Sequence, residues 1–156
     1  EDRFAALDGV VDVVSGYMGG HLDHPSYEQV CSGQTAHAET VEIHSHPQQL
    51  TYTDLVNLFF ELHDPTTQDR QGPNVGSQYR SVVFCNDPDE QQQVQQQIDR
   101  RVEEGVWRGR SCCTQVISPA PTFWQAEEHH QHYYKSIEAS APTEINSSLH
   151  PLPNSK

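Results

Sequence analysis

Short apolar runs, each bounded by polar or turn-forming residues, limit the possible folds of this chain more than any other feature. The runs at residues 10–15, 40–46, 79–85 and 112–118 are typical of strands, because they are rich in β-branched residues or alternate apolar with polar side chains. Between the first two runs, the glycines and the proline of residues 17–33 predict a long loop.

Helical segments separate these runs, and two of them have clear start signals. Thr51 stands three residues before Asp54, in the manner of a capping box, and Asp87 stands three residues before Glu90 with a proline between them. The aromatic and histidine-rich segment 122–134 is expected to be helical after its first aromatic residue. Strands and helices alternate, but the strands are too few for a large doubly wound sheet, so we expect an α+β fold built as a two-layer sandwich.

The length and charge of the chain bound its organisation and its partners. Its 156 residues predict one domain at residues 1–135, followed by a flexible polar tail at 136–156. The net charge of −13 argues against nucleic acid and against an anionic membrane surface, since phosphate binding needs clustered Lys and Arg. No apolar run approaches the roughly 20 residues that span a bilayer.

The chain has four cysteines, Cys31, Cys85, Cys112 and Cys113. The adjacent pair would point to opposite faces of a strand, which is poor geometry for a disulfide framework. We therefore expect free thiols and a reducing compartment, the cytoplasm.

Three blocks of sequence, in the same order along the chain, resemble the A class of peptide methionine sulfoxide reductases. They are GYMGG at 16–20 with YEQVCSGQTAHAE at 27–39, HDP at 63–65 with RQG at 70–72 and GSQYRS at 76–81, and FWQAEEHHQHY at 123–133. The resemblance implies a mixed, largely antiparallel sheet with a ferredoxin-like core. It also implies thiol-dependent reduction of methionine S-sulfoxide, free or in peptides and proteins.

The resemblance assigns roles to particular residues. Glu39 is the acid, and the hydroxyls of Tyr27 and Tyr79 donate to the sulfoxide oxygen. Three further residues, Asn74, His130 and Tyr133, line the substrate site. Without the motif, Glu39 would be interpreted as a solvent-facing residue just before a strand, and the tyrosines as packing residues.

The same resemblance places the nucleophilic cysteine about five residues before Glu1, in a GCFWG segment, and none of the four cysteines present aligns with it. Residues 1–9 read as the last turns of a helix, so we expect a segment upstream. Ala36 stands where the family has glycine, and Asn74 where it usually has aspartate. Residues 136–156 lack the family's resolving cysteine, so recycling through an intramolecular disulfide would require Cys31 or another thiol to take its place.

Two kinds of function are therefore compatible with the sequence. The first is a monomeric reductase that takes electrons from thioredoxin or another thiol reductant and uses no metal or organic cofactor, with the chain as given inactive. The alternative is a non-catalytic relative, either a pseudoenzyme or a binding module for oxidised methionine. A metal site is disfavoured, because the histidines of 44–46 and 129–132 match no strong zinc spacing.

Overall fold

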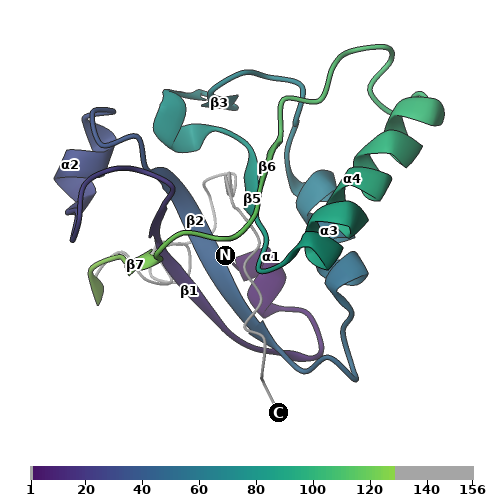
Figure 1. Cartoon of the computed structure of the whole chain (residues 1–156), viewed down its shortest axis with the longest axis horizontal. Helices are drawn as coiled ribbons and strands as arrows, with labels where there is room; N and C mark the ends of the chain where they lie inside the picture. Colours follow the sequence, from purple (N-terminus) through teal and green to yellow (C-terminus); the bar gives the residue numbers. More distant parts are fainter. Residues whose placement is uncertain (1, 129–156) are drawn as a thin grey trace.

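The computed structural model describes residues 2–128, and its centre is a three-stranded antiparallel sheet (Figure 1). The strands β1 (Val10–Met18), β2 (Ala38–Ser45) and β7 (Trp124–Gln125) lie in the order β2-β1-β7. Long pairing between β1 and β2 sets Val13 opposite Ile43. Both side chains are buried, so one face of this pair forms part of the core.

Helices cover the buried side of the strands at one end of the molecule. The helices α3 (Tyr52–Leu62) and α4 (Pro88–Glu103) pack together, and α1 (Asp2–Ala5) lies against β1. Phe4 of α1 and Phe59 of α3 are almost completely buried in the main core cluster. In Figure 1, α3 and α4 lie at one end and α2 (Tyr27–Cys31) lies at the other, next to β7.

Smaller elements complete the fold between these two ends. The strands β5 (Val82–Phe84) and β6 (Gln115–Ile117) pair in parallel, whereas β3 (Arg70–Gln71) and β4 (Asn74–Val75) form a short antiparallel hairpin. A 3-10 turn, η1 (Ser77–Tyr79), follows the hairpin and packs against β2. The combination of helices with mostly antiparallel strands confirms the α+β prediction.

The start signals of the two long helices are confirmed. Thr51 is the N-cap of α3, where its hydroxyl accepts a hydrogen bond from the Asp54 amide at 3.1 Å, and the Asp54 carboxylate accepts one from the Thr51 amide. Asp87 caps α4 by accepting from the Glu90 amide at 2.8 Å. Short polar side chains at these positions satisfy amides that the helix itself leaves unpaired.

The runs expected to be strands at 79–85 and 112–118 form strands only at Val82–Phe84 and Gln115–Ile117. Three further expectations about elements are wrong. The first strand continues through Met18 instead of ending at Ser15, because β7 packs beside it and Gly16 leaves room for the Phe123 ring. The stretch expected to be only loop holds the helix α2. Trp124 and Gln125 form a strand where a helix was expected, and residues 129–134 of that predicted helix lie outside the described part of the chain.

The predicted tail at 136–156 also lies outside the described residues. Within residues 2–128, no helix has the length and apolar character needed to cross a membrane.

Candidate active site

Glu39, Tyr27 and Tyr79 come from three different elements and meet at the end of the sheet where β2 begins. Glu39 is the second residue of β2, Tyr27 the first residue of α2, and Tyr79 the last residue of η1, which packs against β2. Tyr27 interacts electrostatically with both Glu39 and Tyr79. The fold therefore brings together three residues that are up to 52 positions apart in the chain.

Burial makes Glu39 a much weaker acid than an ordinary glutamate. Desolvation raises its pKa from 4.5 to about 7. Among residues 2–128 its carboxyl group has no hydrogen bond or ion pair that would stabilise the charged form. At neutral pH a large share of this group is protonated, so Glu39 is suited to giving a proton to an oxygen that leaves.

Two tyrosine hydroxyls near this carboxyl keep their protons at neutral pH. A side-chain hydrogen bond with Cys31 and burial raise the pKa of Tyr27, and the negative charge of Glu39 adds to the effect. Burial, followed by the charges of Glu127 and Glu39, raises the pKa of Tyr17. Both hydroxyls are thus hydrogen-bond donors, the form that an oxygen ligand requires.

Tyr17 is the residue of this site that sequence reasoning missed. It lies opposite Glu39 in the β1–β2 register, so the two side chains share one face of the sheet, and it is 3% exposed. It also pairs with Trp124 of β7. The signal was present, because Tyr17 stands in the GYMGG block, but the expected end of the strand at Ser15 hid its register with Glu39.

A buried histidine shapes the loop next to the site. The His37 Nδ1 accepts a hydrogen bond from the Gly20 amide at 3.0 Å, and its Nε2 donates to the Leu22 carbonyl at 2.7 Å. Both contacts hold the 19–22 turn against the start of β2. The neighbouring Ala36 has φ +62°, a left-handed backbone conformation that glycine, the residue expected here from the resemblance, adopts without strain.

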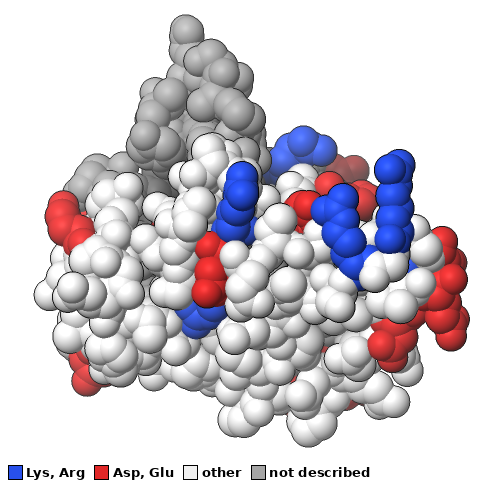
Figure 2. Space-filling view, turned by 90° about the horizontal axis from the view of Figure 1, so that it is seen from above, with Lys and Arg blue, Asp and Glu red and all other residues white. Residues whose placement is uncertain are grey.

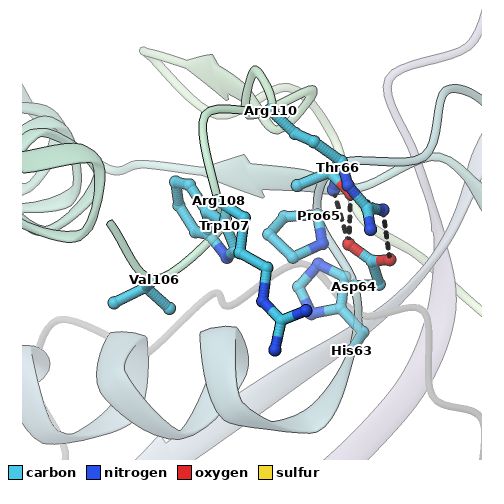
Figure 3. A pocket seen from close by; sticks show the side chains of 8 residues that line it. All are labelled: His63, Asp64, Pro65, Thr66, Val106, Trp107, Arg108 and Arg110. Atoms are coloured by element: carbon cyan, nitrogen blue, oxygen red, sulfur yellow. Dashed lines mark hydrogen bonds and ion pairs between the residues drawn. The ribbon is translucent and has the colours of Figure 1, made fainter. Parts of the chain in front are cut away.

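The HDP block, by contrast, belongs to the scaffold. His63 donates from Nδ1 to the Phe59 carbonyl and accepts at Nε2 from the Ser81 hydroxyl, both at 2.7 Å, and burial lowers its pKa. Figure 3 shows the groove beside it, where Arg110 reaches Asp64 at 4.0 Å. None of the three residues expected to bind the sulfoxide oxygen lines this groove.

The other residues predicted for the substrate site are not brought to this point by the described part of the structure. Asn74 lies in β4, paired with Gln71, and no interaction among residues 2–128 links its side chain to Glu39. His130 and Tyr133 lie outside the described residues. Their proposed roles stay predictions.

All four cysteines are free thiols, and they differ in position. Cys31 is half-buried one helical turn after Tyr27. Cys85 is buried near the Tyr52 hydroxyl, 3.7 Å away, and burial raises its pKa to about 11, which makes it a poor nucleophile. Cys112 and Cys113 precede β6. Among the described residues, no group of three or more His, Cys, Asp or Glu side chains is arranged to hold a metal ion.

Comparison with known proteins gives one consistent result. The family model described as "Peptide methionine sulfoxide reductase" matches residues 1–151. A "Peptide methionine sulfoxide reductase MsrA" from Methanothermobacter thermautotrophicus is 51% identical over 133 residues, which cover 85% of this chain and 78% of the relative. The protein of the same description from Geobacter sulfurreducens is 44% identical over 133 residues, with 85% and 81% covered.

Solved structures agree with the sequence matches. Methionine sulfoxide reductase A of Corynebacterium diphtheriae superposes with a TM-score of 0.81 at 32% identity, covering 88% of this chain and 68% of that one. Reduced Mxr1 from Saccharomyces cerevisiae gives a TM-score of 0.80 at 30% identity, with 95% and 82% covered.

Proposed function

Because the chain belongs to the peptide methionine sulfoxide reductase family, we propose that Glu39, Tyr27 and Tyr79 bind the oxygen of methionine sulfoxide during its reduction to methionine. The protein's function is methionine sulfoxide reduction. In this reaction a cysteine thiolate attacks the sulfoxide sulfur and the sulfur–oxygen bond breaks. Overall, two thiols are oxidised to a disulfide and the oxygen leaves as water.

The observation that carries the proposal is the weak acid Glu39 beside hydroxyl donors. A carboxyl group with a pKa of about 7 keeps enough of its acid form at neutral pH to protonate the departing oxygen. The Tyr27 hydroxyl, which burial and its neighbours keep protonated, donates to the same oxygen. These donors stabilise the charge that develops on oxygen as the bond breaks.

By its three blocks of resemblance to the family, the chain would have its nucleophile ahead of Glu1, in a GCFWG segment. Cys85 is a poor nucleophile because burial raises the pKa of its thiol. Cys112 and Cys113 lie in the segment before β6, and neither aligns with the family's nucleophile. Cys31 lies one turn from Tyr27 and is a candidate for the second thiol rather than the first. We therefore propose that residues 1–156 alone do not turn over.

The finer features of the reaction follow the family. The substrate is the S epimer of methionine sulfoxide, free or in a peptide or protein. A thioredoxin-like protein or another thiol reductant returns the oxidised cysteine to its thiol, and the enzyme acts as a cytoplasmic monomer without metal or organic cofactor.

A reduction assay tests these assignments. We expect no conversion of dabsylated methionine S-sulfoxide by residues 1–156 with dithiothreitol, and conversion once an N-terminal extension supplies Gly-Cys-Phe-Trp-Gly in the family's register. In the extended chain Glu39→Gln lowers kcat by about 10²–10⁴-fold, the usual contribution of a positioned acid. Rapid turnover by residues 1–156 would assign the nucleophile to one of the four cysteines present and overturn the role given to the upstream segment.

A further inference from the structure

We propose that Glu127 and Gln78 are positioning residues that hold the two ends of α2 and thereby fix Tyr27 relative to Glu39 and Tyr79. This inference rests on the proposed role of Tyr27 as a donor to the sulfoxide oxygen. Neither Glu127 nor Gln78 has a role of its own in the chemistry just described.

The helix α2 needs such support because it is too short to form by itself. It has five residues, Tyr27–Cys31, whereas isolated helices below about 12–15 residues are marginal in water. A capping box between Ser26 and Gln29 closes its first turn. That box fixes the local backbone, but it does not attach the helix to the sheet that carries Glu39.

Glu127 attaches the N-terminal end. Its Oε2 accepts a hydrogen bond from the Tyr27 amide at 3.2 Å, across 100 positions of sequence. The residue before Glu127 is itself tied to β1, since the Ala126 amide donates to the Ser15 carbonyl at 2.9 Å. The carboxylate of Glu127 therefore connects the first residue of α2 to the central sheet.

Gln78 attaches the C-terminal end. Its Nε2 donates to the Cys31 carbonyl at 3.2 Å, and the side chain is 6% exposed. Gln78 directly precedes Tyr79, so this bond couples the backbone that carries Tyr79 to the helix that carries Tyr27.

The Gln78 side chain makes its hydrogen bond to the Cys31 carbonyl although its amide oxygen is left unpaired within residues 2–128. The Gln78 Oε1 is buried and has no hydrogen-bond partner among the described residues. Buried polar atoms are normally paired. Gly76, whose lack of a Cβ leaves space for the Gln78 amide, accommodates the side chain in this place.

Glu127 offers the sharper test, because its neighbour provides a matched control. Glu127→Ala removes the acceptor, Glu127→Gln keeps an acceptor oxygen without the charge, and Glu128→Ala removes an adjacent exposed carboxylate. The first readout is amide hydrogen exchange of Tyr27, measured by NMR. The second is the dissociation constant for N-acetyl-methionine S-sulfoxide methylamide.

We expect Glu127→Ala to accelerate exchange of the Tyr27 amide by about tenfold or more, the range for one lost hydrogen bond to a charged group. It should also weaken sulfoxide binding by about tenfold. Glu127→Gln should restore both values to within about threefold of the parent, and Glu128→Ala should change neither. Unchanged exchange in Glu127→Ala, or equal losses in the Gln and Ala variants, would overturn the positioning role.

Gln78→Met provides a second variant, since methionine fills similar volume without a donor. It should accelerate exchange around Cys31 and weaken sulfoxide binding, whereas unchanged values for both would remove Gln78 from the proposal. If the protein without substitutions binds no sulfoxide, the function proposed for Tyr27 fails. The amide exchange rates still decide whether the side chains of Glu127 and Gln78 hold α2 in place.

Discussion

The carboxyl group of Glu39 couples chemistry to stability at a single residue. Its pKa in the folded chain is about 7, above its ordinary value of 4.5, so between these pH values the folded state binds more protons than the unfolded state. Stability therefore falls as pH rises from about 4.5 to about 7 and levels off above that, because the buried charge must then be carried. The buried carboxyl group of Glu39 therefore lowers the free energy of unfolding at neutral pH.

Glu39→Gln should separate the two effects. We expect the stability of this variant to lose its dependence on pH between about 4.5 and 7. At pH 8 the variant should be more stable than the unsubstituted protein by up to about 3 kcal/mol, the free energy that corresponds to the difference between the two pKa values of Glu39. Urea unfolding at pH 5 and pH 8 measures the difference. The exposed Glu128→Gln is the control, and a Glu39→Gln variant with the parent's pH dependence would contradict the assigned pKa.

Ala36 is a residue at which the chain departs from the family, which has glycine at this position. Its φ of +62° places an alanine in the left-handed region, which costs a residue with a Cβ about 1–2 kcal/mol. We expect Ala36→Gly to raise the free energy of unfolding by about 1 kcal/mol, since glycine carries no such penalty but loses more chain entropy. Ala5→Gly, in the helix α1, should lower it instead.

At the scale of elements, the sequence predicts best what short-range chemistry determines. The caps at Thr51 and Asp87 act within four residues, and both helices begin where these caps predict. The helix α2 is too short for apolar periodicity to reveal it, and only its capping box at Ser26 and Gln29 marked it. The strand β7 depends wholly on pairing with β1, more than 100 residues away, so no local pattern predicts it.

The candidate site likewise combines residues that local sequence identifies with residues that only long-range pairing reveals. Motif resemblance selects Tyr27, Glu39 and Tyr79, and the fold brings them to one place. The register of β1 with β2 adds Tyr17, and long-range side-chain bonds add Glu127, because both depend on pairing between distant segments.

The cap of α4 allows a prediction at this scale. Asp87→Ala removes the acceptor for the Glu90 amide, so it should lower the free energy of unfolding by about 1 kcal/mol. Asp89→Ala, two positions further on, removes a charge from the first turn without removing the cap. Thermal unfolding of both variants measures the contrast, and equal destabilisation would mean that charge rather than the cap bond is responsible.

At the scale of the whole molecule, charge is distributed unevenly. The chain has a net charge of −13, yet four of its nine Lys and Arg residues lie between positions 100 and 110, at the end of α4 and in the loop after it. Figure 2 shows basic side chains toward that end of this face, with acidic side chains beside them. The candidate site lies at the opposite end, near α2 and β7, where Glu127 contacts Tyr27 and Glu39 carries a carboxyl group with a pKa of about 7.

This distribution predicts a preference among oxidised peptides. A methionine sulfoxide flanked by lysines should bind more tightly than one flanked by aspartates, by about threefold to tenfold at low ionic strength, because the acidic molecule attracts cations. At about 0.5 M salt the ratio should approach one, since the screening length falls to a few Å. Dissociation constants at both ionic strengths measure the effect, with an uncharged peptide as the control. A preference for lysine that persists at high salt would instead indicate direct contacts between the peptide's charges and residues at the site.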